Sequence, residues 1–252
     1  MFDRLIPFLS SLVLLVGWEL LLSFPRYFIF TVTATIVVFF TLLLKLNKWR
    51  IKDKDFWLLA TPGLSLVILT TAFLLFLSNY WGRQAVIVLI SAASYYFVSY
   101  FYYFLCRITN YTPLSLEQTS SYFNIISYLG LGISAYGFIN LLNLKLWHLA
   151  LTVIAATAVL TYQFFWINKI EERQNLFASI LISVLMAEYF WAISFFPVSH
   201  FISGLSLAII YYAVINLSLA NFLDKLEKKV VRWYLTVGVV CLFVILLSAR
   251  WL

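Results

Sequence analysis

Four side chains in this sequence combine a titratable group with apolar surroundings, and they are the residues best suited to chemistry. Glu19 and Glu188 lie inside long apolar runs, and His148 and His200 lie near the starts of two others. A charged group in hydrocarbon is costly, so such a carboxylate usually faces a partner or a cavity. These carboxylates are suited to binding a cation or a proton, or to a structural hydrogen bond from a protonated carboxyl.

The same residues do not form a local metal-binding motif. Histidines and carboxylates are zinc ligands, but these four come from separate runs with no spacing such as H-E-x-x-H. The sequence therefore predicts no metal and no cofactor, and the histidines are expected to bond to backbone or water. Cys106 and Cys241 lie far apart on apolar runs, which is neither a disulfide framework nor a metal cluster.

These groups are positioned by about nine apolar runs of roughly 20 residues, the length of helix that crosses about 30 Å of hydrocarbon. Of 252 residues, 64% are hydrophobic and 11% charged, whereas a soluble protein is about 25% charged. The runs do not alternate as the strands of a barrel do. We therefore predict an all-α, polytopic transmembrane helical bundle that forms a single integral-membrane domain over residues 1–252. The expected spans cover about 5–24, 27–46, 56–78, 84–106, 121–142, 146–168, 176–196, 200–222 and 233–250.

Basic residues predict the orientation of these spans. The stretch Lys45–Asp55 carries five of the seventeen basic residues and is typical of a cytoplasmic loop. With this loop inside, the N-terminus is cytoplasmic, the C-terminus is outside, and thirteen of the seventeen basic residues lie on the inner side. We expect a multi-pass protein of a bacterial cytoplasmic membrane. Because the net charge of +7 comes mostly from short loops, it does not indicate nucleic-acid binding.

The two carboxylates are expected to share one polar site in the outer half of the bundle. Glu19 lies about 7 Å, and Glu188 about 12 Å, from the outer ends of their spans at 1.5 Å per residue. His148, His200 and Arg26 lie on the same side. The sequence thus predicts that Glu19, Glu188, His148 and His200 line an interior binding site.

Three further patterns concern packing and access. Gly130, Ser134 and Gly137 recur on one helical face and are expected to pack against a neighbouring helix. The tyrosines and phenylalanines of residues 95–104 either line a groove for a lipid or aromatic ligand or form an interfacial aromatic belt. Cys106 is expected at a cytoplasmic helix end, and Cys241 is expected to be buried in the last span.

Two fragments compare with known membrane enzymes. Acidic residues after the second and sixth runs give a layout that resembles the intramembrane prenyltransferases, which hold magnesium on a diphosphate through aspartate-rich loops. Here the loops offer Asp53 and Asp55, and Glu171 and Glu172, without the spaced aspartates of that family. The stretch Phe196–His200 is similar to the F-x-x-x-H fragment of abortive-infection and CAAX-type intramembrane proteases, whose paired-glutamate motif is not reproduced.

Three classes of function stay open. The very short loops favour a non-catalytic membrane subunit or scaffold, with the lipid bilayer and other membrane subunits, or a second copy of the chain, as partners. The intramembrane carboxylates favour a small-solute or ion- or proton-coupled carrier with a polar site in the outer half. The third alternative is an intramembrane enzyme that acts on a lipid-like substrate.

Overall fold

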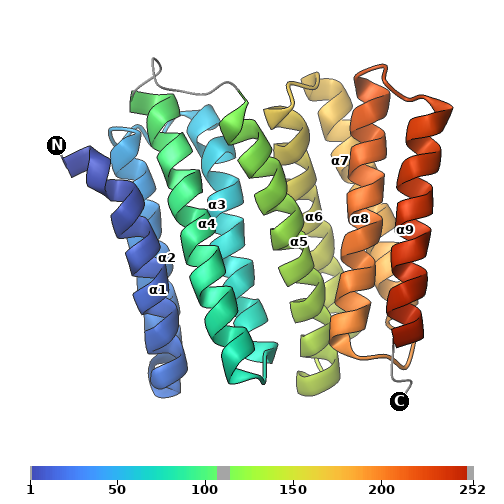
Figure 1. The fold of residues 1–252 in the computed structure, drawn as a ribbon, viewed down its shortest axis with the longest axis horizontal. Coiled ribbons are helices and arrows are strands. Elements are labelled where there is room, and N and C mark those ends of the chain that lie inside the picture. The colour runs from blue at the N-terminus through green and yellow to red at the C-terminus, as the bar shows by residue number, and fades with distance from the viewer. Residues whose placement is uncertain (1, 107–113, 249–252) are drawn as a thin grey trace. The chain divides into compact units, whose positions relative to one another are not determined.

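The computed structural model describes residues 2–106 and 114–248, and every regular element within them is helical. Nine α-helices and two short 3-10 helices, Phe2–Leu5 and Pro25–Tyr27, follow one another in this part of the chain (Figure 1). Eight of these α-helices, α1 to α8, are long and apolar enough to cross a membrane. The prediction of an all-α, multi-pass membrane protein is confirmed to this extent, while the ninth span and the sidedness stay predictions.

The chain divides into two compact units, residues 1–123 and 124–252, and the boundary falls inside α5 (Ser115–Leu142). Unit 1 holds the first turns of α5 together with α1 (Ile6–Ser23), α2 (Phe28–Leu46), α3 (Lys54–Phe76) and α4 (Tyr80–Cys106). Unit 2 holds the rest of α5 together with α6 (Leu146–Ile167), α7 (Glu172–Ile193), α8 (His200–Phe222) and α9 (Lys228–Ser248). The single integral-membrane domain therefore stays a prediction.

Unit 1 is organised around α1, which packs against both α2 and α4. The close approach of α1 to α2 requires Gly17, because a Cβ at that position would collide with the side chain of Thr35. The buried Trp18 donates its indole Nε1–H to Thr71 Oγ1 of α3 at 3.0 Å. Small residues and neutral hydrogen bonds thus hold these helices together, as expected where lipid removes the hydrophobic drive for association.

In unit 2, α6 packs against α7, and α8 packs against α7 and α9. Gly130, Ser134 and Gly137, the predicted packing residues of α5, are buried. A close backbone approach, however, lies between Gly132 and α8, where an added Cβ would be 2.8 Å from the carbonyl oxygen of Gly204. Only glycine permits this contact, since the neighbouring atoms are backbone and cannot rotate away.

Several helices extend beyond the apolar runs that predicted them. The first residues of α5, α7 and α9 are Ser115, Glu172 and Lys228, four to six residues earlier than expected. An apolar run marks only the hydrocarbon depth, whereas a helix can continue through the headgroup region. By contrast, α7 ends at Ile193, three residues early, because the following turn leads into Pro197, which disfavours a helical conformation before it.

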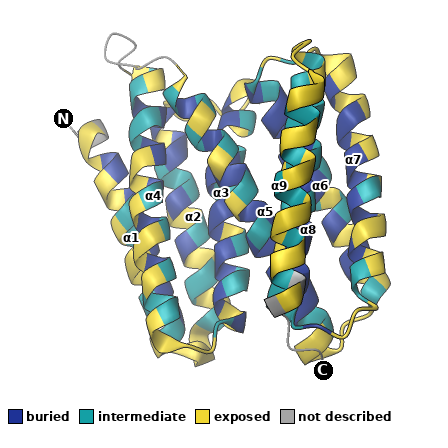
Figure 2. Cartoon of the chain, turned by 45° about the vertical axis from the view of Figure 1, so that its right-hand side comes forward, coloured by how far each residue is buried: buried dark blue, intermediate teal, exposed yellow. Residues whose placement is uncertain are grey.

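Cys241 corrects one expectation. Its side chain is exposed on α9, as is that of Cys106 at the end of α4, so the expectation that Cys241 is buried is wrong within unit 2. The reason is that α9 packs mainly against α8, which leaves most of its circumference uncovered (Figure 2). A place in the middle of an apolar run does not imply a place in the protein interior.

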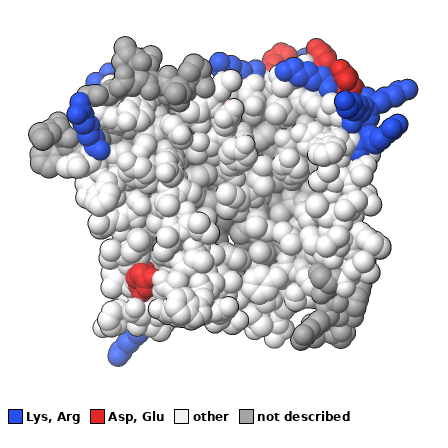
Figure 3. Space-filling model, viewed as in Figure 1, with Lys and Arg blue, Asp and Glu red and all other residues white. Residues whose placement is uncertain are grey.

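Charged side chains lie toward the helix ends, and the broad middle of the visible face carries other residues (Figure 3). In each unit we call the end with more lysine and arginine the basic end. In unit 1 this end carries Arg4 and the five basic residues of Lys45–Asp55, against Arg26 and Arg83 at the opposite end. In unit 2 the single basic residue described at the opposite end is Lys145, and the basic end carries Lys169, Arg173, Lys225, Lys228, Lys229 and Arg232.

Candidate functional site

Glu188 lies on the exposed side of α7, in line with apolar side chains of the same helix. The members of this line recur every three or four residues and therefore share one helical face. They border a shallow groove of about 450 Å³, and we call them the α7 stripe: Phe177, Ile180, Leu181, Val184, Leu185 and Glu188. Phe177 is 71% exposed, so this face is not part of the core of unit 2.

The expectation that Glu188 faces the interior is not met within unit 2, because the other side of α7 packs into the unit. The residues buried on that side include Ile182, Met186 and Phe190. The depth of Glu188 in the membrane stays a prediction. Along the helix, Glu188 lies five residues from the end of α7 at Ile193, about 7.5 Å along the axis at 1.5 Å per residue.

Glu19 occupies a comparable place in unit 1. Its side chain is half-buried, four residues from the end of α1 at Ser23. That end is opposite the basic end, as the Glu188 end of α7 is in unit 2. Because Glu19 and Glu188 belong to different units, a site shared by them stays a prediction.

The two histidines lie at the same end of unit 2 as Glu188. His148 is exposed in the first turn of α6, with its ring stacked on Trp147 at a centroid distance of 3.9 Å. His200 is half-buried at the first residue of α8, beside the ring of Phe201. Within residues 2–106 and 114–248, no three His, Cys, Asp or Glu side chains are grouped so that they could hold a metal ion.

The most enclosed polar groups in unit 2 come from uncharged residues on α5, α6 and α8. None of them has any exposed surface, and we call them the α5–α8 polar cluster: Asn124, Tyr128, Thr157, Thr161, Gln163 and Tyr211. The Tyr211 hydroxyl donates to Asn124 Oδ1 at 2.8 Å. Asn124 Nδ2 in turn donates to the Leu160 carbonyl oxygen at 2.5 Å and to Gln163 Oε1 at 3.3 Å.

The remaining members extend the cluster toward α6. The hydroxyls of Tyr128 and Thr157 are 3.2 Å apart, and those of Thr161 and Tyr211 are 3.4 Å apart. Three helices are thereby joined through side chains that are neutral and already hydrogen-bonded. Such groups are suited to fixing helix positions, since each interhelical bond in a membrane contributes about 0.6 kcal/mol on average.

A second line of hydrogen bonds joins α7 to its neighbours. Asn175 Nδ2 donates to the Tyr162 carbonyl oxygen of α6 at 3.0 Å, and Ser179 Oγ donates to Asn175 Oδ1 at 3.1 Å. Farther along α7, the Tyr136 hydroxyl of α5 donates to the Phe190 carbonyl oxygen at 2.9 Å. Neither network was predicted from the sequence, because the candidate residues were chosen for their charge. Tyrosine, asparagine and glutamine inside the apolar runs were the signal that could have found them.

The aromatic residues of α4 separate into a buried and a surface set. Phe97 and Phe101 are buried, and Phe97 stacks on Phe123 of α5 with a centroid distance of 5.0 Å. Three tyrosines of α4, of which Tyr102 is itself buried, line a groove of about 300 Å³ at the basic end of unit 1. The lining consists of Arg4, Pro7, Tyr95, Ser99, Tyr102 and Tyr103. A lipid or aromatic ligand in this groove stays a prediction.

The helices and their apolar surfaces define the class of this molecule, a multi-pass membrane protein in contact with the lipid bilayer. Within that class, the chain belongs to the DUF5656 family, described as a protein of unknown function, which matches residues 56–248. The matched segment contains His148, Glu188, His200 and the α5–α8 polar cluster, and Glu19 lies outside it. No curated protein and no solved structure matches the chain.

Proposed function

We propose that the protein is a non-catalytic membrane subunit that binds a transmembrane helix of another membrane protein through the α7 stripe. The observation that carries this proposal is the position of Glu188, an exposed carboxyl in line with an exposed apolar helix face. A carboxyl on a helix face that contacts only lipid is energetically costly and gains no hydrogen bond. A face that contacts a helix can bring a hydrogen-bond donor to it.

The environment of the Glu188 carboxyl favours a protein partner on energetic grounds. Ionisable groups in membrane spans are rare and almost always face the protein interior or a water-filled cavity. Glu188 faces neither within unit 2. A partner helix with a serine, threonine, amide or basic side chain at the depth of Glu188 supplies the missing donor, and its apolar residues cover Ile180, Leu181 and Val184.

The interior of unit 2 supports a structural role. Its buried tyrosines, threonines and amides are hydrogen-bonded to one another or to backbone carbonyls. Such side chains stabilise a fixed arrangement of helices. A scaffold needs a fixed arrangement so that its binding surface keeps one shape for the partner. The short connections fit the same role, since α6 ends at Ile167 and α7 begins at Glu172.

In this proposal the protein lies in a bacterial cytoplasmic membrane with its basic ends in the cytoplasm. The support is the unequal distribution of lysine and arginine between the two ends of each unit, which is the bias found in cytoplasmic loops. The N-terminus is then inside. With α9 as a ninth span, the C-terminus is outside.

The proposal is tested by the mass of the complex extracted from native membranes in a mild detergent. The unaltered protein is expected to migrate well above its own 29.2 kDa, after correction for bound detergent. Glu188→Leu removes the carboxyl and is expected to reduce the mass to that of one chain. Glu188→Gln keeps an acceptor oxygen and is expected to preserve the complex.

Glu172→Leu is the matched control, because Glu172 is an exposed carboxyl at the other end of the same helix. It is expected to leave the mass unchanged. Helical content measured by circular dichroism shows that each variant is folded. A single-chain mass for the unaltered protein, or equal masses for Glu188→Leu and the unaltered protein, would overturn the proposal.

The two alternative functions, a solute or ion carrier and an enzyme acting on lipids, have no comparable support. Transport is supported neither by the family nor by the described structure, where the members of the α5–α8 polar cluster bond to one another. A lipid-acting enzyme retains one favourable observation, the groove that Arg4 and three tyrosines line at the basic end of unit 1. No described feature of that groove supplies a nucleophile with an adjacent base.

A further inference from the structure

The start of α9 combines two cations with an uncovered apolar helix face. None of the described side chains of α9 is buried, and Figure 2 shows the helix without the dark blue of buried residues. From its second turn onward, most of the exposed residues are large and apolar: Trp233, Leu235, Val239, Val240, Phe243, Val244 and Leu247. With α9 as the predicted ninth span, this surface would contact lipid.

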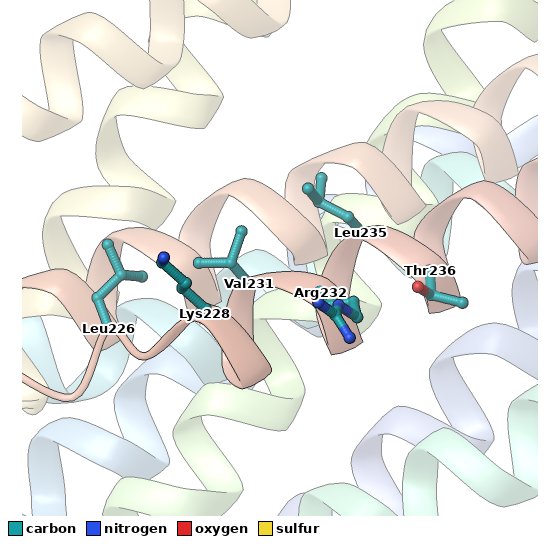
Figure 4. A pocket seen from close by; sticks show the side chains of 6 residues that line it. All are labelled: Leu226, Lys228, Val231, Arg232, Leu235 and Thr236. Carbon is teal, nitrogen blue, oxygen red and sulfur yellow. The ribbon is translucent and has the colours of Figure 1, made fainter.

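A groove of about 520 Å³ lies at the beginning of that surface. Lys228 and Arg232 are four residues apart, so they share one face of the helix. Four other side chains complete the lining along the start of the helix, as Figure 4 shows: Leu226, Val231, Leu235 and Thr236. The groove therefore has a cationic part near the basic end and an apolar part farther along α9.

The two cations are available to a ligand. Asp224 and Glu227 precede α9 in the same connection, and both are exposed. Within the described residues, no ion pair joins either carboxylate to Lys228 or Arg232. Residues 224–232 carry four basic and two acidic side chains, so the local charge is positive and favours an anion.

We propose that this groove binds one anionic phospholipid, with its phosphate at Lys228 and Arg232 and an acyl chain along Val231 and Leu235. The length of the groove fits that occupant. Lys228 and Thr236 are about 12 Å apart along the axis at 1.5 Å per residue, which is enough to run from the headgroup layer into the hydrocarbon. A free phosphate would use the two cations and leave the apolar wall uncovered.

The test uses the full chain in phosphatidylcholine nanodiscs that contain a small fraction of phosphatidylglycerol with a photoreactive acyl chain. After irradiation and digestion, mass spectrometry counts the adducts on residues 226–236. Removing both charges in Lys228→Gln/Arg232→Gln is expected to lower the adduct yield, by about fivefold for each charge lost near an anionic headgroup. The charge-preserving pair Lys228→Arg/Arg232→Lys is expected to keep the yield.

The matched control is Lys169→Gln/Arg173→Gln, a second basic pair with the same spacing at the same end of unit 2. It is expected to leave the α9 adducts unchanged, because it alters the net charge equally without touching the groove. Unlabelled phosphatidylglycerol should displace the probe from these phosphatidylcholine nanodiscs, whereas inorganic phosphate should not. Displacement by inorganic phosphate, or an equal loss in the control pair, would overturn the proposal.

Discussion

The rings of Tyr128 in α5 and Tyr211 in α8 lie face to face, with centroids 3.6 Å apart and planes 8° apart. Both side chains are fully buried. Their hydroxyls approach α6, where the Tyr128 oxygen lies 3.2 Å from Thr157 Oγ1 and the Tyr211 oxygen lies 3.4 Å from Thr161 Oγ1. The ring stack joins α5 to α8, and the two hydroxyl contacts join both helices to α6.

Tyr211→Phe keeps the ring and removes the hydroxyl that donates to Asn124 Oδ1. The expected result is a loss of about 1 kcal/mol in the free energy of unfolding, because one interhelical hydrogen bond disappears and a buried acceptor loses its donor. Unfolding in mixed detergent micelles measures this change.

Tyr189→Phe is the control for that measurement, because Tyr189 is an exposed tyrosine of α7. It is expected to leave the free energy of unfolding unchanged. Equal losses for the two variants, or no loss for Tyr211→Phe, would show that the α5–α8 polar cluster does not stabilise unit 2.

Gly204→Ala is expected to disrupt the crossing of α5 and α8. The added Cβ would collide with the backbone nitrogen of Ile133, which cannot move without separating the helices. Overpacking of this kind costs about 1–3 kcal/mol. The same unfolding measurement is expected to show that loss, together with faster exchange of the amide hydrogens of α5.

Gly238→Ala is the matched glycine variant on α9. There the added Cβ would meet only the Ala213 Cβ at 4.0 Å, an ordinary contact. Stability is expected to be unchanged or slightly higher, since alanine favours helix over glycine by up to about 1 kcal/mol. If Gly238→Ala destabilised the protein as much as Gly204→Ala, the close crossing would not be the cause.

The proposed sidedness is tested through Cys106, which is exposed at the basic end of unit 1. A membrane-impermeant thiol reagent is expected to leave Cys106 unlabelled in intact cells and to label it after the cells are opened. Cys241→Ser removes the second thiol from the assay. Labelling of Cys106 from outside would reverse the proposed orientation.

Eight of the nine spans expected from the apolar runs correspond to helices long and apolar enough to cross a membrane. Such runs predict helices well because every backbone group in hydrocarbon needs an internal hydrogen bond. Which side of each helix faces the interior of its unit was less predictable. Glu188 was expected in the interior and is exposed within unit 2. The side of α7 that packs into the unit carries small and polar residues, including Asn175, Ser179 and Ser183, and Glu188 does not lie on that side.

The buried polar cluster shows a different limit. Asn124, Gln163 and Tyr211 lie up to 87 positions apart in the sequence, so only the packing of α5, α6 and α8 brings them together. The groove on α9 likewise depends on how the helices pack. Its basic residues indicated orientation, but the exposure of the apolar wall beside them depends on how α9 packs against α8.

Photo-crosslinking in native membranes tests whether α7 contacts another protein through its stripe. A photoreactive amino acid is placed at Val184, and in a second protein at Val240 of α9, an equally exposed valine that is expected to face lipid. We expect a protein adduct from position 184 that disappears with Glu188→Leu, and lipid adducts alone from position 240. An adduct with a second copy of the chain would contradict a heteromeric partner, and lipid adducts alone from position 184 would contradict the proposed contact itself.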